Sequence, residues 1–125
     1  MTIAAVSETY GLTPDTLRYY ERIGLIPPVP RTAGGIRDYG EDDLRWIEFI
    51  KCMRLAGLPV DVLAEYVQLC LQGDDTLARR RQLLKEQRDT LVQHIADMQE
   101  TLRRLDLKIE HYDQVTLPIP SDARP

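Results

Sequence analysis

A long segment without proline or glycine, from residue 76 to residue 112, constrains the fold more than any other feature of the sequence. Apolar residues recur in it every seven positions, at Leu77, Leu84, Leu91, Met98, Leu105 and Tyr112, and a second series offset by four comprises Ile95, Leu102 and Ile109. This repeat is typical of helices that pair in a coiled coil. Such a helix spans on the order of 50 Å, and too little chain lies beside it to cover its apolar stripe. We predict that it pairs with a second copy; the alternative is a helix folded back on its own domain.

The long segment divides the chain into three predicted parts. Residues 1–73 form a small domain, residues 74–113 a dimerisation helix, and residues 114–125, which include Leu117 and Pro118, a loose tail. Arg81 and Arg88 interrupt the early turns of the stripe. We therefore expect the dimer contacts to come mainly from Leu84, Leu91, Ile95, Met98, Leu102, Leu105 and Ile109.

Two short helices are predicted at the N-terminus. Thr2 can cap a helix over residues 2–10, and Gly11 follows it as a stop. Thr13 can cap a second helix with Pro14 in its first position, where the missing N–H costs nothing, and Gly24 ends this helix. Two short helices joined by a three-residue turn that contains glycine are typical of a helix-turn-helix.

A hairpin and two further helices are expected to complete the domain. The proline-rich residues 25–30 cannot be helical, and Gly34-Gly35 suits a tight turn, which predicts a small two-stranded wing. A third helix is predicted over residues 41–56. A fourth is expected to begin at Pro59, with the apolar positions Val60, Leu63, Ala64, Val67 and Leu71 facing inward. The predicted fold class is mainly α.

The arginines are concentrated beside these elements although the net charge is −4. Arg18, Arg22, Arg31 and Arg37 fall within twenty residues. A phosphate responds to the local field and not to the sum of charges, so the net charge does not exclude a nucleic-acid partner. The competing interpretation is an ordinary solvated face.

Other classes of protein receive less support from the sequence. We expect a cytoplasmic protein without a membrane anchor, because there is no signal-like N-terminus and no apolar run long enough to span a bilayer. Cys52 and Cys70 are then expected to be reduced thiols. We expect no metal and no other cofactor, since cysteine and histidine do not cluster. An enzyme is also disfavoured, because His94 and His111 lie in the long helix without a catalytic constellation.

With these elements in place, the chain resembles the MerR family of bacterial transcription regulators over residues 1–113. The resemblance rests on three blocks at the expected distances: Leu17-Arg18-Tyr19-Tyr20-Glu21-Arg22-Ile23-Gly24-Leu25-Ile26, Arg31 with Gly35-Ile36-Arg37-Asp38-Tyr39, and Arg54-Leu55-Ala56-Gly57-Leu58. It implies a winged helix-turn-helix homodimer whose long helices form an antiparallel coiled coil. It also implies binding to pseudo-palindromic promoters in double-stranded DNA, which the dimer bends and untwists so that RNA polymerase can engage.

The resemblance and the residue chemistry together suggest a set of DNA contacts. Arg18 is placed to reach a guanine edge or a phosphate, Tyr19 faces the DNA, and Tyr20 is partly core with its hydroxyl on a phosphate. For Thr13, helix capping is as strong an expectation as DNA contact. The full expected set is Thr13, Thr16, Arg18, Tyr19, Tyr20, Arg31, Arg37, Tyr39 and Arg54.

The expected sensor is Cys52. We expect neither the metal site of metal-sensing members, because its cysteines are absent from this sequence, nor the large ligand domain of multidrug-sensing members, because only about a dozen residues follow Tyr112. A cysteine in the block before Arg54 resembles the single-cysteine, aldehyde- and electrophile-responsive subgroup (AdhR- and NmlR-like). The neighbouring Lys51 and Arg54 are placed to favour the thiolate. Three alternatives stay open: a buried, inert Cys52, a regulator that binds a small organic ligand without a covalent bond, and a ligand-independent DNA-binding scaffold. Cys70 is interpreted as core or interface filler.

Overall fold

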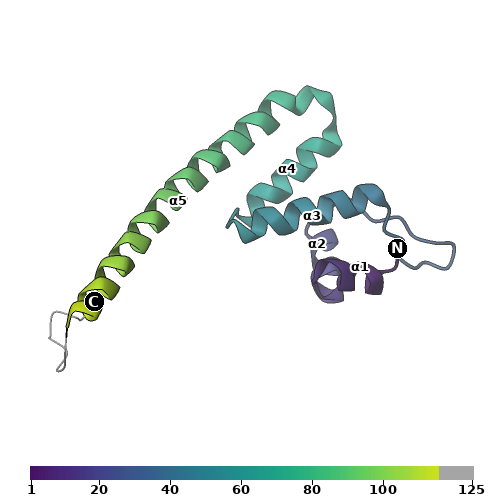
Figure 1. The fold of residues 1–125 in the computed structure, drawn as a ribbon. Helices are drawn as coiled ribbons and strands as arrows, with labels where there is room; N and C mark the ends of the chain where they lie inside the picture. Colours follow the sequence, from purple (N-terminus) through teal and green to yellow (C-terminus); the bar gives the residue numbers. More distant parts are fainter. Residues whose placement is uncertain (116–125) are drawn as a thin grey trace. The chain divides into compact units, whose positions relative to one another are not determined.

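The computed structural model describes residues 1–115, which divide into two compact units, one covering Met1–Gln87 and one that begins at Arg88. The expected tail over residues 114–125 therefore lies almost wholly outside the described residues. The elements in chain order are the helices α1 (Ile3–Tyr10), α2 (Pro14–Arg22), α3 (Glu41–Leu55) and α4 (Val60–Gln72), the short 3₁₀ helix η1 (Asp74–Thr76) and the long helix α5 (Leu77–Gln114) (Figure 1). The protein is mainly helical, as predicted, and α5 runs from the first unit into the second.

The helix-turn-helix is built by the predicted caps. The Thr2 Oγ1 atom accepts a hydrogen bond from the Ala5 N–H at 3.2 Å and begins α1. The Thr13 Oγ1 atom accepts one from the Thr16 N–H at 3.1 Å and begins α2, with Pro14 in the first turn. Between the two helices, Gly11 adopts a left-handed conformation with φ of 67°, which L side chains rarely tolerate. The short turn thus depends on this glycine and on Thr13.

The core of the first unit lies among α1, α2, α3 and α4. Its fully buried side chains include Val6, Leu17, Leu25, Ile26, Ile47, Ile50, Leu63 and Val67. Val60 and Ala64 pack against this cluster as predicted. Leu71 does not: it is 53% exposed, and the prediction that it faces inward is wrong. It lies in the last turn of α4, one turn beyond Val67, where the helix has passed the buried cluster.

The first turns of α5 are fastened to the end of α4. The Thr76 hydroxyl lies 2.7 Å from the carbonyl oxygens of both Leu69 and Gly73, and it can donate its single proton to either. The Arg80 Nη2 atom donates to the Gly73 carbonyl at 3.1 Å, and Leu83 is buried. These contacts explain why the first compact unit continues into α5 as far as Gln87.

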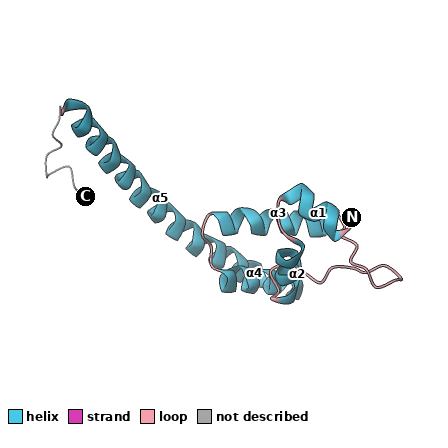
Figure 2. Ribbon diagram, turned by 90° about the horizontal axis from the view of Figure 1, so that it is seen from below, coloured by secondary structure: helices cyan, strands magenta, loops and turns pink. Residues whose placement is uncertain are grey.

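The predicted wing is a hairpin without strands. Arg31 and Arg37 form an isolated antiparallel bridge, and no β-strand occurs in residues 1–115, as the ribbon in Figure 2 shows. The Thr32 N–H donates to the Ile36 carbonyl at 2.7 Å, and the turn closes at Gly35, whose φ is 82°. The expectation of two strands is therefore wrong, although the hairpin itself is present. Pro27, Pro28 and Pro30 supply no N–H, so a ladder cannot extend toward α2.

The second unit exposes the apolar stripe of α5. The exposed positions include Ile95 (46%), Met98 (59%), Leu102 (57%), Leu105 (56%) and Ile109 (57%), whereas Leu91, and Leu84 in the first unit, are partly covered. A contiguous exposed apolar surface of this kind marks a site of association. The stripe follows the predicted seven-residue series, and its pairing with a second copy remains a prediction.

Replacing one residue of the stripe should weaken dimerisation. We expect Leu102→Lys to raise the dimer dissociation constant roughly 100-fold or more. The predicted dimer would bury Leu102 of each copy, and the substitution places two charges against an apolar partner instead. Sedimentation equilibrium measures this constant. Leu107 is 51% exposed but lies outside both apolar series, so Leu107→Lys is the matched control and should dimerise normally. Equal dimerisation of both variants would contradict the prediction that the two copies pair through the apolar stripe.

Candidate nucleic-acid interface

Helix α2 has one buried face and one exposed face. Leu17 and Tyr20 are buried in the core, whereas Arg18 and Tyr19 are exposed. Arg18 pairs with Asp15, with 3.0 Å between Nη1 and Oδ1, and the Asp15 side chain is 95% exposed. Such surface pairs contribute little free energy, so Arg18 can exchange Asp15 for a ligand oxygen at small cost. The Arg22 guanidinium lies over the Tyr19 ring, 5.5 Å from its centroid.

Glu21 joins α2 to the two segments that follow it. Its Oε1 atom accepts a hydrogen bond from the Arg37 Nε–H at 2.7 Å, and its Oε2 atom accepts one from the Val29 N–H at 3.0 Å. The Glu21 and Arg37 side chains are only 16% and 22% exposed. One carboxylate therefore ties the end of α2 to the proline-rich segment and to the hairpin.

The surroundings of Glu21 stabilise its charged form. Burial by itself raises the pKa of Glu21. The hydrogen bonds from Arg37 and from the Val29 N–H, together with the positive charges of Arg37 and Arg31, outweigh burial and hold the pKa below its usual range. The carboxylate is thus ionised at neutral pH and forms a charge-assisted contact with Arg37.

Three arginines converge on a hollow beside this carboxylate. Arg18, Glu21 and Arg22 from α2, together with Pro28 and Arg37, line an open space of about 390 Å³. Three guanidinium groups and one carboxylate give the lining residues a net positive charge. Guanidinium forks match the geometry of phosphate oxygens. The hollow is therefore suited to an anion such as a backbone phosphate.

Four other predicted contact residues lie on exposed parts of the domain. Arg31 lies in the hairpin, and its Nη1 atom donates to the Gly35 carbonyl at 2.8 Å. The Thr13 and Thr16 hydroxyls are 2.8 Å apart at the start of α2, where Thr13 has the capping role that was one of its two expected roles. The Arg54 Nη1 atom donates to the Leu58 carbonyl at 2.7 Å in the turn between α3 and α4.

Tyr20 and Tyr39 are largely buried, which for Tyr20 agrees with its expected position partly in the core. Tyr20 is 8% exposed and Tyr39 is 2% exposed, so both rings belong to the core. Burial raises the pKa of both phenols, an effect that the positive charge of Arg54 offsets in part at Tyr20. The Tyr39 hydroxyl is buried and has no hydrogen-bond partner within residues 1–115. The hairpin bridge ends at Arg37, and the buried hydroxyl of Tyr39 is not available to a phosphate in this structure.

Cys52 is exposed on α3, and its charged neighbours are engaged elsewhere. The Lys51 ammonium donates to the Tyr10 carbonyl at the end of α1, and Arg54 donates to Leu58. Cys70 is half-buried on α4 and accepts a contact from the Arg80 Nη1 atom at 3.8 Å. Cys52 is thus the more accessible thiol, and Lys51 links its helix to the helix-turn-helix.

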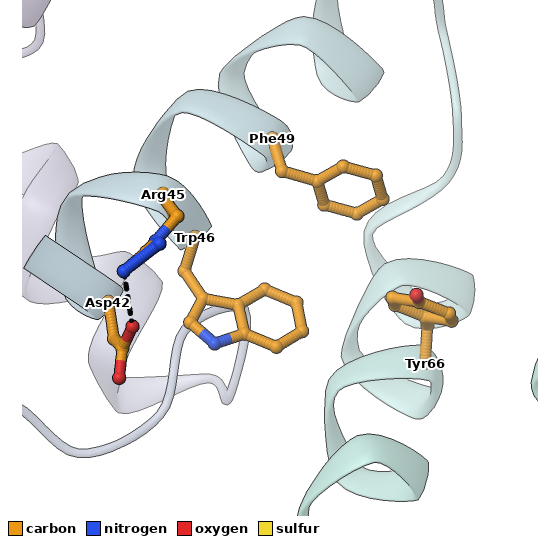
Figure 3. A pocket seen from close by; sticks show the side chains of 5 residues that line it. All are labelled: Asp42, Arg45, Trp46, Phe49 and Tyr66. Atoms are coloured by element: carbon orange, nitrogen blue, oxygen red, sulfur yellow. Dashed lines mark hydrogen bonds and ion pairs between the residues drawn. The ribbon is translucent and has the colours of Figure 1, made fainter.

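An aromatic cluster between α3 and α4 forms a second hollow. Trp46 and Phe49 from α3 and Tyr66 from α4 have ring centroids 5.6 to 6.2 Å apart, and Asp42 and Arg45 stand at their side (Figure 3). The space that these five residues line is about 410 Å³. Aromatic walls with a few polar groups are typical of small-molecule sites.

The sequence analysis did not predict the roles of Glu21 or the aromatic cluster, nor the contact that Lys51 makes with Tyr10. The signal for Glu21 was an acid within a group of arginines, but its partner lies 16 positions away. The signal for Trp46, Phe49 and Tyr66 was weaker, since aromatic residues at helical spacing usually belong to a core. Within the described part of the chain, no helix is both long and apolar enough to cross a membrane, and no group of three His, Cys, Asp or Glu side chains is arranged to hold a metal ion.

The geometry therefore defines a class: a helix-turn-helix domain with an arginine-lined surface, followed by a long helix with an apolar stripe. Comparison with known proteins agrees. Residues 1–70 match the family described as MerR HTH family regulatory protein, and residues 44–107 match the one described as MerR, DNA binding. The chain belongs to the MerR family of DNA-binding transcription regulators, as the sequence motifs predicted, and it is not an enzyme.

Individual relatives support the same family. The chain is 55% identical to the HTH-type transcriptional regulator AdhR of Bacillus subtilis over 93 residues, which are 74% of this chain and 66% of that protein. It is similar to a crystal structure described as a putative MerR family regulator from Listeria monocytogenes, with 50% identity, a TM-score of 0.88 and coverage of 91% of this chain and 86% of the other. It is also similar to HiNmlR, a MerR family regulator lacking the sensor domain and bound to promoter DNA. That match has 29% identity, a TM-score of 0.84 and 90% coverage of both chains.

The Glu21 contacts predict how stability depends on pH. A carboxyl whose pKa is lowered on folding contributes stability that is present above its unfolded pKa and is lost as pH falls through the folded pKa. We expect Glu21→Gln to lower the free energy of unfolding by roughly 1–2 kcal/mol at pH 7. The difference from the wild type should shrink below about pH 4.5. Urea titrations at pH 7 and pH 4 measure it, and a difference that grows in acid would contradict the assignment.

Proposed function

We propose that the chain binds double-stranded promoter DNA as a homodimer through the exposed face of α2 and the hairpin. The observation that carries this proposal is the hollow in which Arg18, Arg22 and Arg37 converge beside that face. The proposed contacts are Thr13, Thr16, Arg18, Tyr19, the hydroxyl of Tyr20, Arg31, Arg37 and Arg54, to which Arg22 is added. The promoter-bound structure of HiNmlR supports promoter DNA as the ligand.

The proposed mechanism is deformation of the promoter. Two domains, held at a fixed spacing by an antiparallel pairing of the long helices, would bind two half-sites. Bending and untwisting the DNA between them costs several kcal/mol in typical cases. Firm contacts on both half-sites must supply this energy. The bent promoter would then present its elements to RNA polymerase in line, which turns repression into activation.

Two arginine variants test the contacts separately. We expect Arg18→Ala to reduce preference for the specific site by roughly 10-fold or more, because a bidentate arginine discriminates between bases. Arg37→Ala should weaken binding to specific and random duplexes alike, since phosphate contacts carry no sequence information. Titrations of both duplexes by fluorescence anisotropy measure these effects.

A third arginine is the control for this test. Arg45 lies on α3, exposed and paired with Asp42 at 2.9 Å, and it does not line the arginine hollow. Arg45→Ala removes the same charge and should leave both affinities within about 3-fold of the wild type. Undiminished binding by both Arg18→Ala and Arg37→Ala would refute the interface.

We further propose that Cys52 senses aldehydes or other thiol-reactive electrophiles. Its thiol is exposed, and the preceding residue, Lys51, reaches the end of α1. The thiolate sulfur would add to the aldehyde carbon, and the carbonyl oxygen would take a proton to give a hemithioacetal. An adduct on α3 would disturb the Lys51 contact and so shift the helix-turn-helix. The relationship to AdhR supports this choice of inducer.

Replacing each thiol in turn tests the sensor. We expect Cys52→Ser to bind the promoter normally and to lose the transcriptional response to aldehyde in a purified transcription assay. Cys70→Ser, at the half-buried thiol, is the matched control and should respond like the wild type. A Cys52→Ser protein that still switches would exclude the thiol mechanism. Equal output from the wild type with and without aldehyde would favour a ligand-independent scaffold.

A second candidate function replaces the thiol with a non-covalent ligand. The hollow lined by Trp46, Phe49 and Tyr66 favours it, because the three rings give it aromatic walls and Asp42 and Arg45 add polar groups. Retention of the response in Cys52→Ser together with its loss in Trp46→Ala would select this candidate.

A further inference from the structure

Glu21 stands where a negative charge opposes the proposed ligand. It lines the same hollow as Arg18, Arg22 and Arg37, which we propose to face phosphates. A carboxylate there repels the DNA backbone and subtracts from the positive field. A residue that only contributed binding energy at this position would be neutral or basic.

The geometry shows what the carboxylate does instead. Its two oxygens point to different segments: Oε1 to Arg37 in the hairpin and Oε2 to the Val29 N–H in the segment between α2 and the hairpin. The Val29 side chain is itself buried, with 5% exposed. The proline-rich segment is thus held on both its backbone and its side chain, and the hairpin is held by Arg37.

The pairing also orients Arg37. Only its Nε–H is directed at Glu21, whereas a guanidinium has five N–H donors. Arg37 borders the arginine hollow as well. The contact therefore fixes the plane of the guanidinium without consuming the fork that would meet a phosphate.

We propose that Glu21 is a positioning residue that sets the hairpin at a fixed distance from α2, so that the dimer can hold DNA in a deformed shape. This inference rests on the proposed DNA-binding function. Binding needs positive charge near phosphates, and this attraction changes little when the hairpin moves slightly relative to α2. Holding a bent duplex needs two anchors that do not move relative to each other, and Glu21 connects them.

The inference predicts a separation of binding from bending in Glu21→Gln. The amide has the same shape but loses the charge that holds Arg37. Affinity for a random-sequence duplex should stay within 3-fold of the wild type or become tighter, because one negative charge is removed near the phosphates. The deformation of a specific duplex at saturating protein should fall by at least half.

The experiment uses the full-length dimer and a duplex selected by the wild-type protein from a random-sequence library. Anisotropy gives the affinities, and energy transfer between dyes at the duplex ends gives the bend. Glu48→Gln is the charge-matched control, because Glu48 is exposed on α3 and outside the hollow; it should behave like the wild type. Circular dichroism establishes that each variant is folded. If Glu21→Gln fails to fold, Glu21→Asp replaces it, since the shorter side chain keeps the charge but cannot span both Arg37 and Val29.

Three results would overturn the inference, and they are distinguishable. If the folded Glu21 variant bends the duplex as much as the wild type does, the hairpin does not need Glu21 to hold its position. A parallel loss of more than 10-fold in affinity for both duplexes, in a folded variant, shows that Glu21 maintains the binding surface and has no separate role in bending. Absence of duplex binding by the wild-type protein removes the proposed function itself, and the inference with it.

Discussion

The hydrogen bonds of one carboxylate organise the side of this domain that we propose to face DNA. Helix α2 is short, the next segment contains three prolines, and the hairpin has a single antiparallel bridge. None of these pieces has enough internal hydrogen bonding to hold its place alone. Glu21 contacts the latter two through Val29 and Arg37, and the buried tyrosine Tyr39 closes the hairpin onto the core. The placement of the arginines follows from this arrangement.

Local signals in the sequence predicted most of the helices well. Thr2, Thr13, Pro14 and Gly11 act within a few residues of their own positions, so their effects can be read without knowing the fold. The family motifs in turn predicted a regulator of the MerR type, and the family comparisons confirm it. The sequence was therefore sufficient for the class of protein and for the face of α2 that carries Arg18.

Features that depend on distant residues escaped prediction. Tyr39 was expected to contact DNA, but its ring packs in the core cluster, which depends on residues distant in the sequence. Glu21 and Arg37 each look like exposed charges in the sequence; their pairing at 2.7 Å depends on how the proline segment returns to α2. The exposure of Leu71 depends on where the core ends. In each case the deciding fact is a tertiary contact, which no local pattern contains.

The prolines before the hairpin have a consequence for how copies of this protein meet one another. A hairpin with open backbone donors along its edge is a template for pairing with a neighbouring chain. Pro27, Pro28 and Pro30 remove three of those donors on the strand-like approach to Arg31. The hairpin of a neighbouring copy therefore meets few backbone N–H donors at this segment. Copies bound close together on DNA would not readily pair their hairpins into one β-sheet. The exposed apolar stripe of α5 is then the surface at which we expect two copies to associate.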